Sequence, residues 1–225
     1  MMIELKNISK KFNDLQILKN FNISFEQDKI TCLFGPSGVG KTTIANIAAK
    51  LIPVESGDVS GADKVLYSYV FQEPRLLEWY SVYNNIDFVL KDLFDTERRK
   101  EITDNYIDMV ELNDYKDYKP KALSGGMAQR VSLARAFAYP SDILIMDEPF
   151  KGLDIKLKME MILSFQKLWL ESKRTVIFIT HDIDEAILLS DVIYVIKNRP
   201  AEIIKKIYTN QYPNTDEIKN ILLSY

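Results

Sequence analysis

The sequence has little of several things that would point to a special class of protein. Cysteine occurs once, as Cys32, so no disulfide can form within the chain and a cysteine-rich zinc site is disfavoured. The longest apolar runs, such as 143–146 and 176–179, are far shorter than the roughly 20 residues of a membrane-spanning helix. These absences favour a protein that folds in a reducing compartment around an ordinary core.

An excess of positive charge is missing as well. The 225 residues include 29 Lys and Arg against 32 Asp and Glu, a net charge of -3, so a chain-wide basic surface for nucleic acid is absent. Hydrophobic residues make up 47% and charged residues 27%, which is typical of globular proteins and excludes intrinsic disorder. The length suits one domain with room for a subdomain.

The N-terminal part has the pattern of strands followed by a helix. The first 30 residues alternate apolar and polar side chains, with a turn at Asn13-Asp14. Residues 31–34 form a short apolar run that stops at Gly35 and predict a buried strand. After that, Ile44, Ile47, Ala48 and Leu51 share one helical face, and we expect Pro53 to end this helix and a loop to cover 54–61.

The rest of the chain alternates helices and strands. Residues 76–120 show helical spacing and predict a small helical subdomain, and another helix is expected after Ser124. The apolar runs 143–146 and 176–179 are typical of central parallel strands, each followed by a helical segment. This alternation predicts an α/β fold with a largely parallel sheet.

A glycine-rich segment lies between the first buried strand and the first helix. It fits the pattern G-x-x-x-x-G-K-[ST], in which backbone amides and a helix N-terminus bind phosphate. Lys41 is expected to reach the β- and γ-phosphates and Thr42 to bind Mg²⁺. A turn that needs glycines for geometry alone is the alternative, which the Lys-Thr pair disfavours. The predicted nucleotide-binding residues here are Gly35, Pro36, Ser37, Gly38, Val39, Gly40, Lys41, Thr42 and Thr43.

Two acidic residues follow the apolar run 143–146. The strand should deliver Asp147 to the sheet edge, where it can hold Mg²⁺ through a water, while Glu148 faces another way and can accept a proton from the attacking water. A solvated strand end is the alternative. His181 follows the run 176–179, at the edge where such folds place their sites, and we expect it near the γ-phosphate.

Further motifs resemble one family. The segment Leu123-Ser-Gly-Gly-Met-Ala-Gln-Arg130 resembles the signature motif of ABC-type ATPases. Gln72 resembles the glutamine that opens their helical subdomain, Asp154 their D-loop aspartate, His181 their switch histidine and Phe12 their adenine-stacking aromatic. Six motifs occur in the family's order, and the resemblance covers residues 3–200.

The resemblance implies a single ABC ATPase domain over 1–225, with ATP and Mg²⁺ as cofactors. Its P-loop NTPase core with an N-terminal antiparallel β subdomain would comprise 1–71 and 141–225, and its helical signature subdomain 72–140. Two copies would meet head to tail, each closing on the nucleotide of the other. The implied catalytic residues are Glu148, His181, Gln72 and Lys41, the metal ligands Thr42, Gln72 and Asp147, and the partner-facing nucleotide contacts Ser124, Gly125, Gly126 and Asp154.

Within the family, the segments 71–77, 123–130 and 147–150 resemble the ATP-binding subunits of nitrate, sulfonate and taurine importers, although Lys151 stands where a small residue is common. This implies a homodimer at the cytoplasmic face of the membrane, held by permease subunits and served indirectly by an extracytoplasmic solute-binding protein. The cargo would be a small anion or sulfonate-like solute; nitrate or a thiamine-precursor pyrimidine fits nearly as well. Leu76, Leu77, Trp79 and Tyr80 would form the permease groove, or else subdomain core.

Other functions remain open at this point. A soluble ABC ATPase acting on ribosomes or DNA generally carries two ABC modules or a long coiled-coil insertion, for which 225 residues leave no room. A non-catalytic nucleotide sensor would be favoured if Lys41, Glu148 or His181 were missing, and none is. An exporter ATPase is also possible, because the motifs do not encode the direction of transport.

Overall fold

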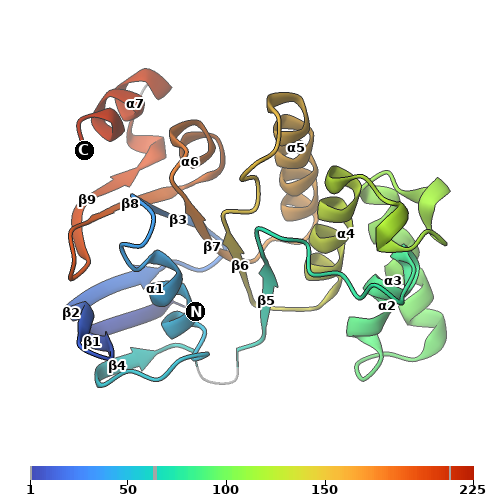
Figure 1. Ribbon diagram of the computed structural model, residues 1–225, viewed down its shortest axis with the longest axis horizontal. Helices are drawn as coiled ribbons and strands as arrows, with labels where there is room; N and C mark the ends of the chain where they lie inside the picture. The colour runs from blue at the N-terminus through green and yellow to red at the C-terminus, as the bar shows by residue number, and fades with distance from the viewer. Residues whose placement is uncertain (1, 63–64, 213) are drawn as a thin grey trace. The chain divides into compact units, whose positions relative to one another are not determined.

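The computed structural model describes residues 2–62, 65–212 and 214–225 (Figure 1). The chain divides by packing into two compact units. The first comprises Met1–Tyr67, Asp142–Glu148 and Arg174–Tyr225, and the second comprises Ser68–Ser141 and Pro149–Lys173. These units follow from packing alone and do not test the subdomain boundaries expected from the sequence. Those boundaries remain a prediction.

A three-stranded antiparallel sheet of order β2-β1-β4 lies in the first unit. Its strands are β1 (Ile3–Phe12), β2 (Leu15–Phe25) and β4 (Ser56–Ser60). The two long strands confirm the alternation in the sequence, with Leu5 opposite Ile23. The loop predicted over 54–61 is wrong, because β4 pairs with β1 there. Its side chains are mostly exposed, so no apolar alternation marks it as a strand.

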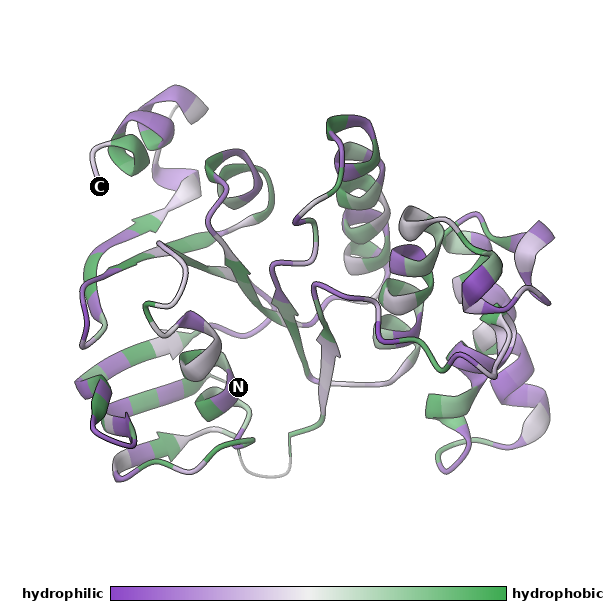
Figure 2. Ribbon diagram, viewed as in Figure 1, coloured by the Kyte–Doolittle hydropathy of each residue, from purple (hydrophilic) through white to green (hydrophobic). Residues whose placement is uncertain are grey.

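The larger sheet has six strands in the order β5-β6-β7-β3-β8-β9. These are β3 (Ile30–Phe34), β5 (Tyr67–Val70), β6 (Ile143–Asp147), β7 (Thr175–Thr180), β8 (Val192–Lys197) and β9 (Glu202–Tyr208). β6, β7, β3 and β8 run parallel, and only the pair β8–β9 among the described registers of this sheet is antiparallel. The central strands are buried along their length and strongly hydrophobic (Figure 2), as the solid apolar runs predict.

Neighbouring parallel strands bring distant parts of the sequence to one sheet edge. The carboxyl ends of β3, β6 and β7 lead directly to Gly35, Asp147 and His181, and β7 lies between the other two. Ligands of open α/β sheets bind at this edge. The topology therefore gathers in one place Gly35 and two residues that lie more than a hundred positions after it in the sequence.

Helix α1 (Lys41–Ala48) is shorter than the sequence predicts. It ends before Leu51, which is 60% exposed rather than on a buried face. The amide of Leu51 donates to Asn46 O and that of Lys50 to Ile47 O, each at 2.9 Å, while Lys50 adopts a left-handed φ of 54°. These bonds form a Schellman motif, which closes the helix before the proline that was expected to end it.

Two further α-helices belong to the first unit. They are α6 (Ile183–Leu189) and α7 (Thr215–Leu223), and η4 (Thr209–Gln211) is a single 3₁₀ turn. α7 packs on α6, and Lys219 on α7 bonds Asp184 on α6 at 2.9 Å. This contact ties the last helix to the region that follows β7.

The second unit is helical. Its α-helices are α2 (Val82–Asp87), α3 (Thr96–Met109), α4 (Gly125–Ala138) and α5 (Ile155–Glu171), and its 3₁₀ turns are η1 (Phe88–Leu90), η2 (Asn113–Tyr115) and η3 (Pro120–Ala122). Each α-helix begins at a Ser or Asp whose side chain accepts a backbone amide of the first turn: Ser81, Asp95, Ser124 and Asp154.

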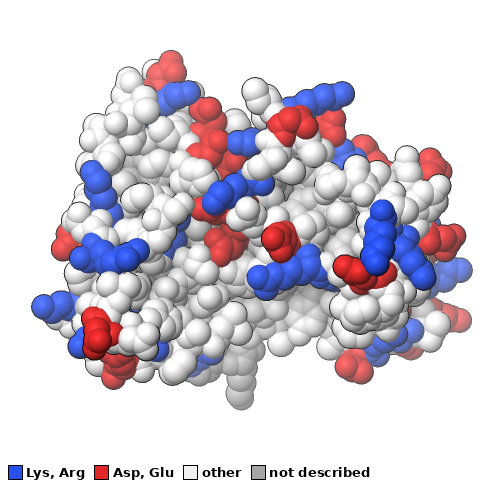
Figure 3. Space-filling model, viewed as in Figure 1, with Lys and Arg blue, Asp and Glu red and all other residues white. Residues whose placement is uncertain are grey.

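The described part of the chain contains no helix that is both long and apolar enough to cross a bilayer. On the face drawn in Figure 3, basic and acidic side chains are interspersed, without an extended patch of one sign among the described residues. This agrees with the balanced composition.

Candidate functional site

The phosphate-type loop links β3 to α1, as the sequence predicts. Gly35 has a φ of 154°, and a Cβ there would collide with the backbone carbonyl of Ile196 at the end of β8. Only glycine fits so close an approach. α1 starts at Lys41 with Gly40 as its N-cap, so the amides of its first turn lie at the end of the loop, where a helix favours anions.

Lys41 is already engaged within the loop. Its side chain is buried at 4% exposure, and Nζ donates to Gly35 O at 2.7 Å and to Pro36 O at 2.8 Å. The ammonium therefore lies inside the curve of the loop. It is placed to exchange these neutral carbonyls for the more strongly attracting oxygens of a phosphate.

Thr42 and Asp147 are brought together from α1 and β6. Thr42 Oγ1 donates to Asp147 Oδ2 at 2.9 Å. A hydroxyl and a carboxylate are the hard oxygen donors that Mg²⁺ prefers. Among the described residues, no group of three or more His, Cys, Asp and Glu side chains could hold a metal ion. A cation here would thus also draw on phosphate oxygens and water, as Mg²⁺ with nucleotides usually does.

Glu148 and His181 form the second pair at this edge. His181 Nδ1 lies 3.2 Å from Glu148 Oε1, and the amide of Glu148 donates to Ile179 O at 3.0 Å. Glu148 adopts a φ of 47°, which is unfavourable for a non-glycine residue and turns its side chain away from the direction of the strand. Backbone strain of this kind gathers at functional sites.

The loop that carries His181 is fixed by a chain of hydrogen bonds. Thr180 Oγ1 donates to Glu185 Oε2 at 2.6 Å and accepts from the amide of Asp182 at 3.0 Å. The carboxylate of Asp182 in turn accepts the amide of Glu185 at 3.1 Å. These bonds limit the freedom of the backbone on either side of the histidine.

Phe12, the expected adenine-stacking residue, lies at the end of β1. Its ring is 47% exposed, and Lys10 Nζ is 5.2 Å from its centroid. An exposed ring with a cation over one face offers a surface on which a base can stack. The remaining loop residues Ser37, Gly38 and Val39 lie between β3 and α1, and Thr43 lies in the first turn of α1.

The other predicted residues belong to the second unit and form a separate group. Ser124 caps α4 by accepting the amide of Met127 at 3.2 Å, and Asp154 caps α5 by accepting that of Leu157 at 3.0 Å. Around Gly125 the backbone is open, whereas a Cβ at Gly126 would collide with the side chain of Leu157. The predicted N-cap role of Ser124 is confirmed.

Gln72 is exposed, and α4 holds the backbone on both sides of it. Gln129, buried at 2% exposure, donates to Phe71 O at 3.2 Å and to Pro149 O at 2.8 Å. Arg135 donates to Pro74 O at 3.0 Å and to Arg75 O at 3.1 Å. Burial lowers the pKa of the Arg135 guanidinium, which stays charged because arginine starts so high.

An aromatic surface follows Gln72. Trp79 is 68% exposed and Phe88 is 45% exposed, with Tyr80 between their rings. Asn85, which is fully buried, holds the loop that carries Trp79. Its Oδ1 accepts the amide of Leu77 at 2.8 Å, and its Nδ2 lies within hydrogen-bonding distance of three backbone carbonyls of the same loop.

The sequence interpretation missed several residues that shape these sites. Arg199, in the turn between β8 and β9, donates to Gly38 O in the phosphate-type loop. Gln129 and Arg130 stand in the quoted motif 123–130, which marked them without giving their contacts. Arg199 has no such signal, because its contact depends on β8 lying beside β3.

Comparison with known proteins identifies the family. A family model described as ABC transporter matches residues 18–151. A putative ATP-binding protein of Brucella abortus biovar 1 (strain 9-941) is 36% identical over 96% of this chain and 86% of its own length. An aliphatic sulfonates import ATP-binding protein, SsuB, of Bacillus thuringiensis subsp. konkukian (strain 97-27) is 37% identical over 92% of this chain and 85% of its own length.

Solved structures agree. The ATP-binding cassette MJ0796, solved as a dimer after hydrolysis with ADP and Pi, superposes with a TM-score of 0.78 at 27% identity, covering 92% of this chain and 98% of that one. CbiO1 of Clostridium perfringens reaches 0.85 at 23% identity over 98% and 94% of the two chains, which supports the fold. The chain belongs to the family of ABC transporter ATP-binding proteins, and it is an ATP hydrolase with the P-loop NTPase fold expected from its sequence.

Proposed function

We propose that this chain is the ATP-hydrolysing subunit of an importer for a small anionic solute of the sulfonate type. The observation that carries the proposal is the 37% identity to a protein named for aliphatic sulfonate import, over 92% of the chain. The chain would lie at the cytoplasmic face of the membrane, bound to separate permease subunits and served indirectly by an extracytoplasmic solute-binding protein.

In this proposal the first unit holds and hydrolyses the nucleotide. The base stacks on Phe12, and the amides of residues 35–43 face the phosphates. Lys41 leaves its carbonyl partners for the β- and γ-phosphates. Glu148 accepts a proton from the water whose oxygen attacks the γ-phosphorus, while the bond from that phosphorus to the β,γ-bridging oxygen breaks and ADP departs. His181, 3.2 Å from Glu148, orients that carboxylate and faces the γ-phosphate.

Mg²⁺ is the proposed metal cofactor. Thr42 and Asp147 would hold it in the first unit, and Gln72 is the ligand that the family motif adds. When bound, the ion neutralises charge on the β- and γ-phosphate oxygens. The pair Thr42–Asp147 supports this assignment, because its two oxygens are already 2.9 Å apart without the ion.

The second unit would serve the nucleotide of a second copy. Ser124, Gly125 and Gly126 stand at the start of α4, and Asp154 stands at the start of α5. The dimeric structure of MJ0796 supports a homodimer. We propose that its arrangement is head to tail, so that these residues meet the partner's ATP. The aromatic surface of Trp79, Tyr80 and Phe88, with Leu76 and Leu77, would receive the permease, since exposed Trp and Tyr are frequent at protein interfaces.

Replacing Glu148 by Gln tests the catalytic assignment. The amide cannot accept the proton of water, so we expect steady-state hydrolysis to fall by roughly 10² to 10⁴ while ATP affinity changes little. Phosphate release and calorimetric titration, with and without Mg²⁺, are the measurements. Wild-type turnover in the variant would remove Glu148 from the catalytic group.

The import assignment is tested through the partners. If permease and binding-protein genes lie beside this one, co-expression with them should yield a membrane complex whose ATPase activity rises when the binding protein carries its solute. A complex that is stimulated instead by a compound added on the cytoplasmic side would favour an exporter. Isothermal titration of the binding protein with a sulfonate, nitrate or a pyrimidine would identify the cargo.

A further inference from the structure

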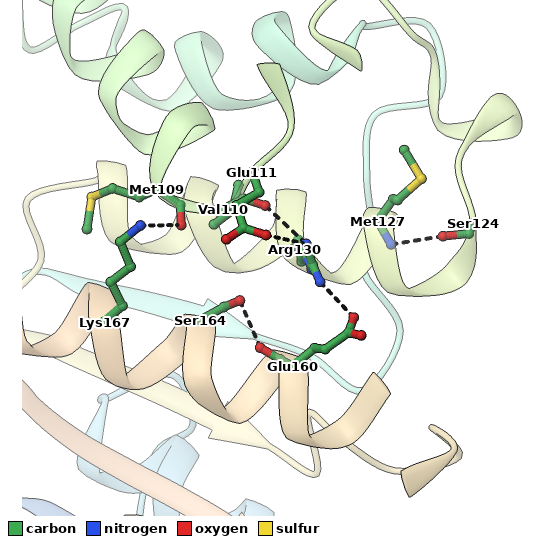
Figure 4. A network of polar contacts seen from close by, with 9 residues as sticks. All are labelled: Met109, Val110, Glu111, Ser124, Met127, Arg130, Glu160, Ser164 and Lys167. Carbon is green, nitrogen blue, oxygen red and sulfur yellow. Dashed lines mark hydrogen bonds and ion pairs between the residues drawn. The ribbon is translucent and has the colours of Figure 1, made fainter. Parts of the chain in front are cut away.

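A polar network joins three helices of the second unit (Figure 4). Arg130 on α4 lies at its centre, between the end of α3 and the second turn of α5. Its Nη2 donates to Glu160 Oε2 at 2.8 Å, and its Nη1 lies 3.5 Å from Val110 O and 3.7 Å from Glu111 Oε2. The guanidinium thus ties α5 to the last turn of α3.

The ion pair is well shielded on one side. The side chain of Arg130 is 16% exposed and that of Glu160 is 40% exposed. Pairs with this degree of burial are screened less by water and salt than fully exposed pairs. The guanidinium is also the cation best suited to several oxygen partners at fixed angles.

α4 and α5 pack closely at both ends of their contact. At the start of α4, Gly126 rests directly against Leu157 on α5. Near the other end, the rings of Phe137 on α4 and Phe165 on α5 meet with centroids 6.0 Å apart. Beside these contacts, an open surface pocket of about 340 Å³ is lined by Arg130, Glu160, Leu163 and Lys167, among others. On the side of that pocket, α4 and α5 are joined by the polar contact of Arg130 with Glu160.

Both helices begin at a residue that the proposed dimer needs. Ser124 is the N-cap of α4, and Asp154 is the N-cap of α5. Arg130 and Glu160 each follow their cap by six positions, about 1.7 turns along the helix. The pair is therefore close enough to the caps to fix their separation.

We propose that the Arg130–Glu160 pair is a positioning element, which holds Ser124 and Asp154 at the spacing required to engage the nucleotide of a second copy. This inference rests on the proposed head-to-tail dimer. Two loops that are fixed before contact lose less conformational freedom on association than two loops that move independently. Breaking the pair should therefore weaken dimerisation but leave nucleotide binding by the monomer intact.

The test is a double-mutant cycle in a Glu148→Gln background, in which ATP hydrolysis is expected to be slow. Dimer dissociation constants with ATP would be measured by sedimentation for the parent, Glu160→Ala, Arg130→Met and the double variant. We expect each single change to weaken the dimer roughly three- to thirtyfold, and the double change to weaken it no more than Arg130→Met. Monomer affinity for ATP should stay within about twofold in all four.

The pair Asp104–Lys116 provides the matched control. Its atoms lie 2.7 Å apart with side-chain exposures of 37% and 33%, and it connects α3 to the chain after η2 rather than α4 to α5. Asp104→Ala should leave dimerisation unchanged. Glu160→Gln keeps a hydrogen bond to Arg130 and should lie between the parent and Glu160→Ala, which separates positioning from a general loss of stability.

The outcomes are distinguishable. If the parent dimerises with ATP but Glu160→Ala has no effect, or the two single changes are additive, the positioning role is wrong while the dimer stands. If Asp104→Ala weakens the dimer as much as Glu160→Ala, the effect is one of stability and the proposal is also wrong. If the parent itself stays monomeric with ATP, both the proposed dimer and the positioning role are wrong.

Discussion

At the scale of single residues, Lys41 is the side chain that we propose binds the nucleotide phosphates. Replacing it by Ala removes the buried ammonium and leaves the carbonyls of Gly35 and Pro36 without its two bonds. Hydrogen bonds to a charged group contribute about 1.5–3 kcal/mol, so we expect Kd for ATP to rise roughly ten- to a hundredfold. Calorimetric titration measures this, and Lys19→Ala, an exposed lysine on β2, is the control. An unchanged Kd would contradict phosphate binding by this loop.

Cys32 is a second residue with a definite expectation. It is fully buried in β3, and burial raises the pKa of its thiol, so the reactive thiolate is absent at neutral pH. We expect no labelling of the native protein by a thiol reagent, and one label per chain in denaturant because the chain has a single cysteine. Raising the pH to 9 should not change this, since the shift moves the pKa upward. Rapid labelling of the native protein would show that β3 opens.

The sequence names candidate site residues, whose roles remain predictions, but it does not give their contacts. The motifs named Lys41, Thr42 and Asp147 because residue type and spacing alone mark them. The strained φ of 47° at Glu148 and the bond from Arg199 to Gly38 depend on how β6, β7 and β8 stack beside β3. Such neighbours across a parallel sheet are set by topology, which short-range patterns do not contain.

At the scale of elements, the loop between β5 and α2 presents Trp79. Because this side chain is 68% exposed, Trp79→Ala should change the melting temperature little, whereas the loss of a core tryptophan costs about 3–5 kcal/mol. We expect the variant to bind ATP normally and to lose most of its binding to the permease in a pull-down.

The second tryptophan of the chain supplies the control for that experiment. Trp169 lies on α5, partly buried, with Lys173 Nζ 5.3 Å from its ring. Trp169→Ala should retain permease binding although it removes a side chain of the same size. A large drop in melting temperature for Trp79→Ala, or equal loss of binding in both variants, would sink the groove assignment.

Element types followed well from apolar periodicity, and the failures have physical causes. β1, β2, β3, β6 and β7 bury one or both faces, so their patterns are strong. β4 buries almost nothing and is held through backbone pairing with β1, which leaves no trace in side-chain type. α1 stops early because Lys50 adopts a left-handed conformation. Lysine does not favour this conformation, so the residue type gives no sign of the helix end.

At the scale of the whole molecule, the expected response to ATP is assembly. Glu148→Gln keeps the groups proposed to close the dimer but lacks the base needed to consume ATP. We expect this variant to elute as a dimer with ATP and Mg²⁺ in size-exclusion chromatography with light scattering, and as a monomer with ADP. Wild-type protein should remain largely monomeric, because hydrolysis removes the bridging γ-phosphate.

Obstructing the partner-facing start of α4 should abolish this assembly without affecting the nucleotide pocket of the same chain. Ser124→Arg in the Glu148→Gln background places a bulky cation at the start of α4, which should block closure on a second copy. An ATP-dependent dimer that survives this change would contradict the head-to-tail arrangement, whereas a dimer that forms equally well with ADP would contradict the role of the γ-phosphate.

The hydrogen bonds of Lys41 within the loop have a consequence for the rates of nucleotide binding and release. Since its ammonium already joins Gly35 O and Pro36 O, an arriving triphosphate meets a loop that needs no ordering and only exchanges one set of partners for another. Association should then proceed at the rate of encounter. The same two carbonyls compete with bound ADP for the ammonium. This competition should favour the departure of ADP.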